Sequence, residues 1–487
     1  MANALLLPAL ALALVLILAV PGKSAEGPLV IEPDGVEGSR LLFWATSSLE
    51  RVYPNSAPGD RQTLEVLMPR GGQASFQLCC RNERVWPLHI ECQVEAPEGL
   101  SVTVRRVGYV PVRFHTTEVD PSLQEGSEYI PGYVPDPLWP DQVADVGPGE
   151  NVSFWVTVRA NTDAQPGSHT LKARLSFHEG TQQAELEAKA RVSRVVLQPR
   201  HDFPVVHWWR AECLWDWYET EPFDERWWQL AEAYLTDLHT HGTDVCYVPS
   251  LFMRRETFKR PAHLLIIDES SPGQYSFDFS RVERFIKLAR KTGFEQFEWP
   301  HLWIYWGLHN AMPVYNNAQG EAKLLWPIET GAFSDTYRVF LEQYLPAWHT
   351  FLLKEKLLRH SWFHLSDEPG AADDVDRYRK AREWLRELAP WMKVMDALSD
   401  IEYGRQGLTD TPIPVISAAQ AYIDEGIPHW VYFCCGPRGP YLQRLLDTPL
   451  TTIRMSGWLF YRLRADGFLH WGYNYWHAME QERLVDP

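Results

Sequence analysis

In Trp362-Phe-His-Leu-Ser-Asp-Glu-Pro-Gly370, an apolar run ends in two adjacent carboxylates and is then broken by Pro-Gly. The segment that follows, Asp374–Leu388, carries apolar residues at helical spacing, with Asp373 as the expected N-cap. A strand, a short loop and a capped helix make one βα unit. The pattern therefore places Asp367 and Glu368 at the carboxyl end of a strand, the face on which barrel enzymes carry their active sites.

The same rhythm of short apolar runs and helical patterns extends through the chain after Pro199. Eight candidate strands are Phe203–Trp208, Val245–Pro249, Phe294–Glu298, Trp362–Ser366, Lys393–Asp396, Pro414–Ser417, His429–Cys434 and Phe468–Tyr473. The intervening helices include Asp224–His239, Ser280–Thr292, Ser334–Leu358 (with a break at Pro346 left open) and Asp374–Leu388. Eight βα units in this length predict a (β/α)₈ TIM-like barrel over residues 201–487. A doubly wound open sheet is the alternative, but no Gly-rich phosphate loop opens a helix.

The first part of the chain has a different pattern, with short alternating segments separated by turn residues. The expected strands include Gln73–Cys79, Leu88–Val94, Val152–Val158, Thr170–Phe177 and Ala184–Val192. Period-two strands at this spacing predict an antiparallel β-sandwich domain over residues 26–200. The polar insertion Thr116–Gly149 is longer than a simple connecting loop between strands. We therefore expect it to extend toward the second domain.

Composition limits the kinds of partner. The chain has 487 residues, is 45% hydrophobic and carries a formal net charge of −17, which disfavours nucleic-acid and anionic-membrane partners. Its 22 tryptophans lie mostly after residue 201. These tryptophans could form flat aromatic surfaces that stack on sugar rings, or they could pack in an indole-rich core. The sequence favours neither interpretation.

The N-terminus has the pattern of an export signal. Ala4–Val20 is apolar apart from Pro8, and a small-residue site follows at Ala25. This predicts a signal peptide over residues 1–25 and a secreted or periplasmic protein, with an uncleaved anchor as the alternative. No later stretch is apolar enough to span a membrane.

The seven cysteines do not form a disulfide framework. Their number is odd and their spacing irregular, so buried thiols are favoured over a Cys79 or Cys80 bridge to Cys92. Cys434 and Cys435 have no identifiable base partner that would make either one a catalytic thiol.

The adjacent carboxylates suggest a particular glycosidase chemistry. Glycosyl transfer needs a carboxylic acid to protonate the leaving oxygen, and ordinary retaining enzymes place a second carboxyl about 5–5.5 Å away, across the sugar. Neighbours on one strand end lie more easily on the same side of the ligand. A 2-acetamido oxygen of the substrate can then be the nucleophile, with Asp367 orienting the amide and Glu368 acting as acid and then base. A protein nucleophile is the alternative, with four candidates: Asp396, Asp424, Glu298 and Asp216.

Further candidate residues lie near other strand ends. The candidate substrate-binding residues are His301, Trp306, Tyr432, Arg454, Trp458, Trp471 and Asn474. Core packing is an equal alternative for the aromatic residues, and Arg454 suits a structural ion pair as well as a ligand contact. The pair His239 and His241 precedes the second strand, on the barrel face away from the carboxylates, so we expect no metal there. We expect no cofactor.

Several motifs together resemble glycoside hydrolase family 123 and its relatives. They include the Ser-Asp-Glu-Pro segment at 366–369, His429-Trp-Val-Tyr-Phe-Cys-Cys-Gly-Pro437, Thr452-Ile-Arg-Met-Ser-Gly-Trp458 and Gly467-Phe-Leu-His-Trp-Gly-Tyr-Asn-Tyr-Trp476. Gly293-Phe-Glu-Gln-Phe-Glu-Trp-Pro-His301, Trp306-Gly307 and Asp136-Pro-Leu138 extend the likeness to most of the chain.

The resemblance implies an N-terminal β-sandwich, a (β/α)₈ barrel and β-N-acetylgalactosaminidase activity with substrate assistance. It assigns the catalytic roles to Asp367 and Glu368 and makes a glycan or glycoconjugate the expected partner. A hydrolase for a non-acetamido sugar and a non-catalytic carbohydrate-binding surface protein are the alternatives.

Overall fold

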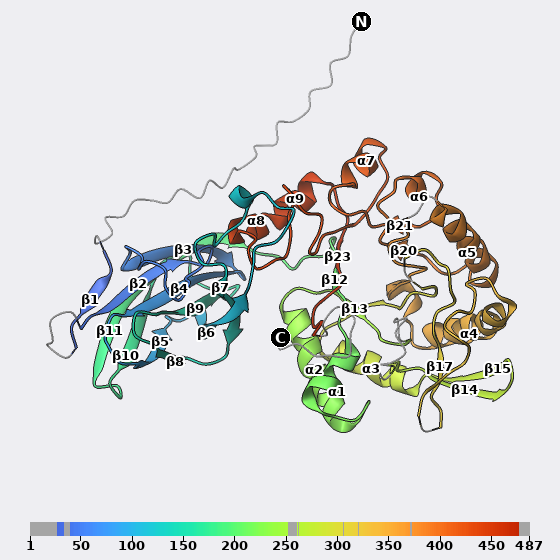
Figure 1. Ribbon diagram of the computed structural model, residues 1–487, viewed down its shortest axis with the longest axis horizontal. Helices are drawn as coiled ribbons and strands as arrows, with labels where there is room; N and C mark the ends of the chain where they lie inside the picture. The colour runs from blue at the N-terminus through green and yellow to red at the C-terminus, as the bar shows by residue number, and fades with distance from the viewer. Residues whose placement is uncertain are drawn as a thin grey trace, which may run out of the picture. The chain divides into compact units, whose positions relative to one another are not determined.

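The computed structural model describes residues 27–33, 39–251, 261, 263–304, 306–319, 321–370 and 373–476 (Figure 1). The predicted signal peptide lies outside these residues. The chain divides into two compact units, one comprising residues up to His115 and Gly126–Gln198, the other comprising Thr116–Glu125 and the residues from Pro199 on.

The first unit is a sandwich of two sheets. One sheet has the order β1 (Leu29–Ile31), β2 (Leu41–Ser47), β4 (Gln73–Asn82), β9 (Asn151–Ala160), β6 (Leu100–Val112) and β7 (Gly132–Trp139). The other has the order β3 (Thr63–Arg70), β11 (Gln182–Val196), β10 (Gly167–Phe177), β5 (Leu88–Glu95) and β8 (Val143–Val146). Neighbours run antiparallel except β3 and β11, which are parallel.

Alternation along the strands builds the core of the sandwich. In β11, Ala184, Leu186, Ala188, Ala190 and Val192 are buried while the residues between them are exposed. Because successive side chains of a strand point to opposite faces, one face of the sheet packs in the core and the other faces outward. The prediction of a β-sandwich is confirmed.

Part of the predicted insertion belongs to the second unit. Residues 116–125, which include the 3₁₀ turn η1 (Pro121–Leu123), lie between β6 and β7 in sequence. The backbone N–H and hydroxyl of Thr116 donate to the carboxylate of Asp447 at 2.7 and 2.8 Å, and Glu125 N–H donates to the Asp447 carbonyl at 2.8 Å. These bonds attach the segment to the chain between β22 and β23.

The second unit has eight parallel strands within the described residues. They are β12 (Val205–His207), β13 (Val245–Tyr247), β16 (Gln296–Glu298), β19 (Ser361–Trp362), β20 (Met395–Asp396), β21 (Thr411–Pro412), β22 (Val431–Tyr432) and β23 (Phe468–His470). The nine described helices are α1 (Ala211–Tyr218), α2 (Glu225–Thr240), α3 (Ser280–Lys291), α4 (Asp335–Lys354), α5 (Asp374–Leu388), α6 (Glu402–Arg405), α7 (Ala419–Asp424), α8 (Leu450–Arg454) and α9 (Ser456–Arg462). Two hairpins, β14 (Ile266–Ser271) with β15 (Gln274–Asp278) and β17 (Tyr315–Asn316) with β18 (Lys323–Leu324), and the turn η2 (Leu358–His360) complete the unit.

The strands close into a ring. Parallel pairing runs from β22 through β23, β12, β13 and β16 to β19. Bridges between Phe363 and Val394 and between Val415 and Tyr432 join the paired β20 and β21 to the two ends of that row. Helices are arranged around the ring (Figure 1). The arrangement is a TIM-like barrel, as predicted.

Details differ from the expected elements where proline or tertiary packing intervenes. The sixth strand is β21 at Thr411–Pro412, which pairs with β20, and the predicted Pro414–Ser417 follows it. In that segment the Pro414 carbonyl accepts from Tyr432 N–H, and Ile416 N–H donates to the Tyr432 carbonyl. Helix α4 continues through Pro346, with Tyr344, Leu345 and Trp348 packed in the core on either side. Asp373 occupies the N-cap position of α5, but its side chain makes no capping hydrogen bond.

The tryptophans mainly build the core of the second unit. Their rings pack against other aromatic rings, for example Trp299 edge to face with Trp348 at 5.3 Å and Trp209 stacked on Phe285 at 5.7 Å. The buried ones are Trp208, Trp209, Trp215, Trp227, Trp228, Trp299, Trp303, Trp326, Trp348 and Trp430. Core packing therefore accounts for most of the indole excess.

Candidate active site

The chain after β19 carries the two adjacent carboxylates at the carboxyl end of the barrel strands. The neighbouring segment holds it in place, since Trp303 N–H donates to the Leu365 carbonyl and Trp306 N–H to the Asp367 carbonyl, both at 2.9 Å. The Ser366 hydroxyl donates to the Ile304 carbonyl at 2.9 Å. Because these bonds reach both sides of Ser366, the strand end is fixed up to Asp367.

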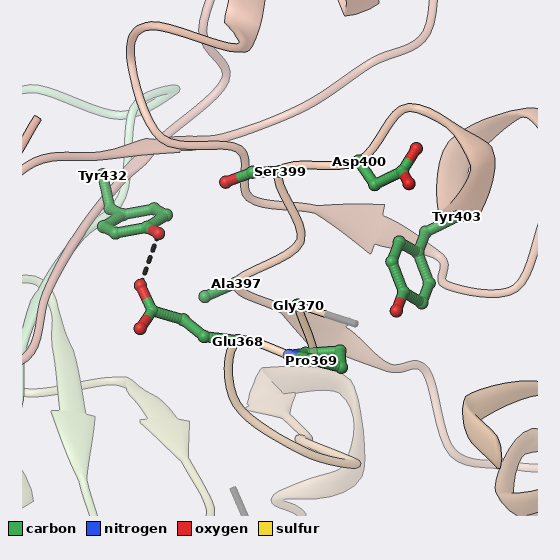
Figure 2. A pocket seen from close by; sticks show the side chains of 8 residues that line it. All are labelled: Glu368, Pro369, Gly370, Ala397, Ser399, Asp400, Tyr403 and Tyr432. Carbon is green, nitrogen blue, oxygen red and sulfur yellow. Dashed lines mark hydrogen bonds between the residues drawn. The ribbon is translucent and has the colours of Figure 1, made fainter. Parts of the chain in front are cut away.

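Glu368 has an unusual backbone conformation. Its φ is +42°, in the left-handed region that non-glycine residues rarely occupy, and Pro369 follows it. A residue before proline normally adopts an extended conformation, so this geometry costs on the order of 1–3 kcal/mol. A strained conformation of this kind persists where contacts with the surrounding structure hold the backbone in place. Here the conformation directs Glu368 toward Tyr432 (Figure 2).

A hollow of about 230 Å³ opens beside Glu368. Its lining residues are Glu368, Pro369, Gly370, Ala397, Ser399, Asp400, Tyr403 and Tyr432 (Figure 2). The Tyr432 hydroxyl donates to Glu368 Oε1 at 2.5 Å, while the Asp400 carboxylate points away from Glu368. Glu368 is exposed and Asp367 half-buried, and Asp367 is not among the lining residues.

The carboxyl of Asp367 has a strongly raised pKa. Burial is the largest cause of the shift at Asp367 and repulsion from Glu368 the second, and they raise the pKa of Asp367 to about 8 against the opposing charges of His364 and Arg210. The Asp367 carboxyl therefore holds its proton near neutral pH. The site contains a carboxylic acid at Asp367.

Beneath the pair lies a fully buried charged network. His364 Nδ1 is 2.9 Å from Asp396 Oδ1, and His364 Nε2 bonds Glu298 Oε1. Burial disfavours the charged imidazole, but the facing carboxylates of Glu298 and Asp396 outweigh it and raise the pKa of His364 to about 10. Trp208 Nε1 donates to Glu298 Oε1 at 2.8 Å and Tyr378 to Asp396 Oδ2 at 2.5 Å. His364 is thus an imidazolium, three residues before Asp367.

Some members of this network have the side-chain types that ligate metals. Among the described residues, the potential ligand atoms of His301, His364 and Asp396 lie within 4.8 Å of one another. Both nitrogens of His364 are already bonded to carboxylates, however. The contacts are those of an ion-pair network.

The structure brings some of the predicted substrate-binding residues to the carboxylates. Tyr432 bonds Glu368, and Trp306, whose side chain is 61% exposed, bonds Asp367 through its backbone. His301 is buried with its ring 4.4 Å from that of His364. Burial and then the charge of His364 lower the pKa of His301 well below its usual value.

Other predicted residues have different surroundings. Asn474 is 2% exposed and bonds the backbone of Arg210 through both ends of its amide. Trp471 is half-buried and packs edge-on against Tyr475 at 5.0 Å. Arg454 ends α8 and Trp458 lies on α9, and both are exposed. Both residues lie in the helices between β22 and β23. Among the described contacts, neither one touches Asp367 or Glu368.

The candidate nucleophiles also separate into two groups. Glu298 and Asp396 are buried in the network, whereas Asp216 lies on α1 and Asp424 ends α7. His241 of the His239–His241 pair bonds its own helix, at the Asp237 carbonyl.

Sequence reasoning missed Ser399, Asp400, Tyr403 and Arg210. A signal for two of them exists, because Leu398-Ser-Asp400 repeats the Leu365-Ser-Asp367 pattern at the end of the next strand. The position of Arg210 after β12 had no comparable signal, and its charge acts on Asp367.

A TIM-like barrel with an adjacent carboxyl pair beside a hollow at its carboxyl-end rim has the features of a glycoside hydrolase catalytic domain. The family model described as glycoside hydrolase 123, catalytic domain, matches residues 208–487. Because this match covers more than half of the chain, the chain belongs to glycoside hydrolase family 123, and the second unit is its catalytic domain.

Comparison with solved structures supports the fold. A family 123 glycoside hydrolase from Clostridium perfringens, studied for glycolipid glycan hydrolysis, aligns over 90% of this chain and 79% of its own, with a TM-score of 0.70 and 14% identity. β-Glucuronidase 3 of Bacteroides uniformis aligns over 89% of this chain and 47% of its own, with a TM-score of 0.29 and 8% identity. No match was found among curated protein sequences.

Proposed function

We propose that this glycoside hydrolase cleaves 2-acetamido-2-deoxy-hexosides, with β-N-acetylgalactosaminides as the preferred substrates, by a substrate-assisted retaining mechanism. The observation that carries the proposal is the adjacency of Asp367 and Glu368 on one strand end, with Glu368 facing a hollow. The Clostridium relative, studied for glycolipid glycan hydrolysis, supports a glycoconjugate substrate.

In the first step, protonated Glu368 gives its proton to the glycosidic oxygen as the bond to the anomeric carbon breaks. The acetamido oxygen of the sugar forms the new bond to that carbon, which yields a positively charged oxazolinium ring. Ionised Asp367 accepts the amide N–H and stabilises the positive charge. In the second step, Glu368 takes a proton from water, and the water oxygen opens the ring with net retention.

The raised pKa of Asp367 fits this division of roles. Before substrate binds, burial holds a proton on Asp367, because its pKa is raised to about 8. A bound amide N–H donates to the ionised form of Asp367 and so favours movement of the proton to Glu368. Substrate binding would thereby create the general acid.

The test is hydrolysis of aryl β-N-acetylgalactosaminides by the wild type, Glu368→Gln and Asp367→Asn. Each substitution removes a group that acts in the transition state, so we expect kcat/KM to fall by about 10²–10⁴-fold. Asp376→Asn, on the exposed face of α5, is the matched control and should keep full activity. Full activity of both site variants would overturn the proposal.

A second assay separates the acetamido mechanism from hydrolysis of another sugar. A thiazoline analogue mimics the ring intermediate, so only a substrate-assisted enzyme should bind it far more tightly than the substrate. Turnover of non-acetamido glycosides without thiazoline inhibition would favour the alternative hydrolase, and glycan binding without any turnover would overturn the proposed catalysis.

We also propose that the protein is exported. The apolar run Ala4–Val20 followed by small residues supports this. Within the part of the chain that the structure describes, no helix is long and apolar enough to cross a bilayer. N-terminal sequencing of protein recovered outside the cytoplasm should show a start after Ala25, and an intact Met1 on cytoplasmic protein would contradict export.

A further inference from the structure

Two adjacent cysteines lie on the loop that follows β22. Cys434 and Cys435 have their sulfurs 3.8 Å apart, with Cys435 exposed and Cys434 half-buried. The other five cysteines, Cys79, Cys80, Cys92, Cys213 and Cys246, are all buried. An oxidant in solution would therefore reach this pair before any other thiol of the chain.

The pair is close in sequence to a residue of the candidate active site. Tyr432, two residues before Cys434, holds Glu368 through its hydroxyl. The backbone around Cys434 is tied at two points, because its N–H donates to the Gly436 carbonyl at 2.8 Å and its carbonyl accepts from Arg444 N–H at 2.7 Å. These bonds restrain Cys434 on the side of Gly436 and Arg444, and Tyr432 precedes it on the other side.

The two thiols differ in reactivity. A hydrogen bond from Cys434 is the largest cause of a lowered pKa at Cys435, about 6, and the nearby charge of Arg438 also contributes. The hydrogen bond and burial raise the pKa of Cys434. Cys435 is therefore suited to attack first, with Cys434 as the resolving thiol.

We propose that Cys434 and Cys435 form a reversible vicinal disulfide that lowers the activity of the adjacent site. The co-reactant is a low-molecular-weight disulfide. The Cys435 thiolate bonds one of its sulfurs and expels the other as a thiolate, which leaves a mixed disulfide. Cys434 Sγ then loses its proton, attacks Cys435 Sγ and expels the second small thiol. The protein loses two electrons and two protons, and the small disulfide becomes two thiols.

Geometry makes the bond reversible and couples it to the site. Neighbouring Cα atoms lie about 3.8 Å apart, below the roughly 4.4–6.8 Å of ordinary disulfides, so the ring is strained and readily reduced. Closure must bring the sulfurs from 3.8 Å to about 2.05 Å, which requires a backbone shift. Because Tyr432 lies two residues away, we expect the shift to move the hydroxyl that holds Glu368.

The experiment equilibrates the full chain with oxidised or reduced glutathione and then alkylates it under native conditions. Intact mass and peptide mapping should show two labelled thiols in the reduced protein. After oxidation, residues 434 and 435 should be unlabelled, with a mass lower by two hydrogens. Glycosidase activity should fall by about tenfold or more on oxidation, as expected for misplaced catalytic groups, and return with reductant.

Two serine variants are the matched controls. Cys435→Ser should keep its activity in oxidised glutathione, and Cys434→Ser should stop at a glutathione adduct on Cys435. Retention of two reactive thiols in oxidised wild type, or only a stable adduct, would overturn the disulfide. Ring closure without a change in activity would overturn its regulatory effect.

The thiol measurements need no substrate, so they stand apart from the proposed function, on which only the activity measurement rests. Hydrogen exchange supplies a second reading of the coupling without substrate. Peptides containing residues 365–370 and 430–436 should both change their exchange on oxidation, and unchanged exchange at 365–370 would overturn the coupling even if the proposed substrate is wrong.

Discussion

The hydroxyl of Tyr432 donates a 2.5 Å hydrogen bond to Glu368 Oε1 and joins the ends of two barrel strands that are 64 residues apart in sequence. Tyr432 is half-buried and is the last residue of β22. Its backbone also pairs with Val415 in a parallel β-bridge, so the backbone that carries its ring is held in place. Glu368 is exposed and has a φ of +42°. The bond therefore gives an exposed carboxyl one orientation at the edge of the hollow.

Removal of this hydroxyl should weaken catalysis while leaving the fold intact. A hydrogen bond to a charged group contributes about 1.5–3 kcal/mol, so Tyr432→Phe should lower kcat/KM by roughly 10–100-fold. Tyr441→Phe changes an exposed tyrosine of the following loop and is the control. Steady-state kinetics decides the matter, and unchanged kcat/KM in Tyr432→Phe would show that Glu368 needs no such support.

The pH dependence of kcat/KM should have an alkaline limb near pH 8. Burial and repulsion from Glu368 raise the pKa of Asp367 to about 8, so below that pH Asp367 holds a proton. Above that pH Asp367 loses this proton, none is left to pass on to the leaving group, and the rate should fall tenfold per pH unit. Circular dichroism over the same range excludes unfolding as the cause. A rate that is flat to pH 10 would contradict a catalytic role for the proton held at Asp367.

The buried imidazolium should be important for stability. His364→Ala leaves Glu298 and Asp396 buried without their shared cation, which should lower the free energy of unfolding by about 3–5 kcal/mol. The exposed pair of Arg284 and Glu225 is the comparison, and Glu225→Gln should cost at most about 1 kcal/mol. Urea unfolding followed by tryptophan fluorescence measures both. Equal losses would mean that the network contributes no more than a surface ion pair.

Asn474 should act on stability rather than on substrate affinity. Its Oδ1 accepts from Arg210 N–H at 2.6 Å and its Nδ2 donates to the Arg210 carbonyl at 3.0 Å. Asn474→Ala leaves both backbone groups without this partner, so the free energy of unfolding should fall by about 1–3 kcal/mol. Asn474→Asp retains the acceptor and should lose less. A raised KM with unchanged unfolding would restore Asn474 as a ligand residue.

Local patterns were sufficient to predict the architecture. Apolar runs followed by helical spacing located all eight barrel strands to within a few residues, because both periodicities are properties of neighbouring residues. The Ser-Asp-Glu-Pro segment located the carboxyl pair for the same reason, since a strand that ends in Pro-Gly before a helix must place those side chains at its carboxyl end.

The surroundings of the site could not be predicted in this way. The partners of His364 lie 66 and 32 residues away in sequence, and nothing in the composition around Glu298 or Asp396 marks them as its counter-ions. The same holds for Asn474, whose position near a strand end fits a ligand contact as well as the backbone bridge that it makes.

The amino-acid sequence alone therefore determined the order of strands and helices, the two-part organisation and the strand end that bears Asp367 and Glu368, because each depends on short-range alternation and chain breaks. Only the tertiary structure decided which residues face that pair, where most of the indoles are buried and why the pKa of Asp367 is raised. Those properties depend on closure of the barrel, which brings distant strand ends together and removes water from the groups between them.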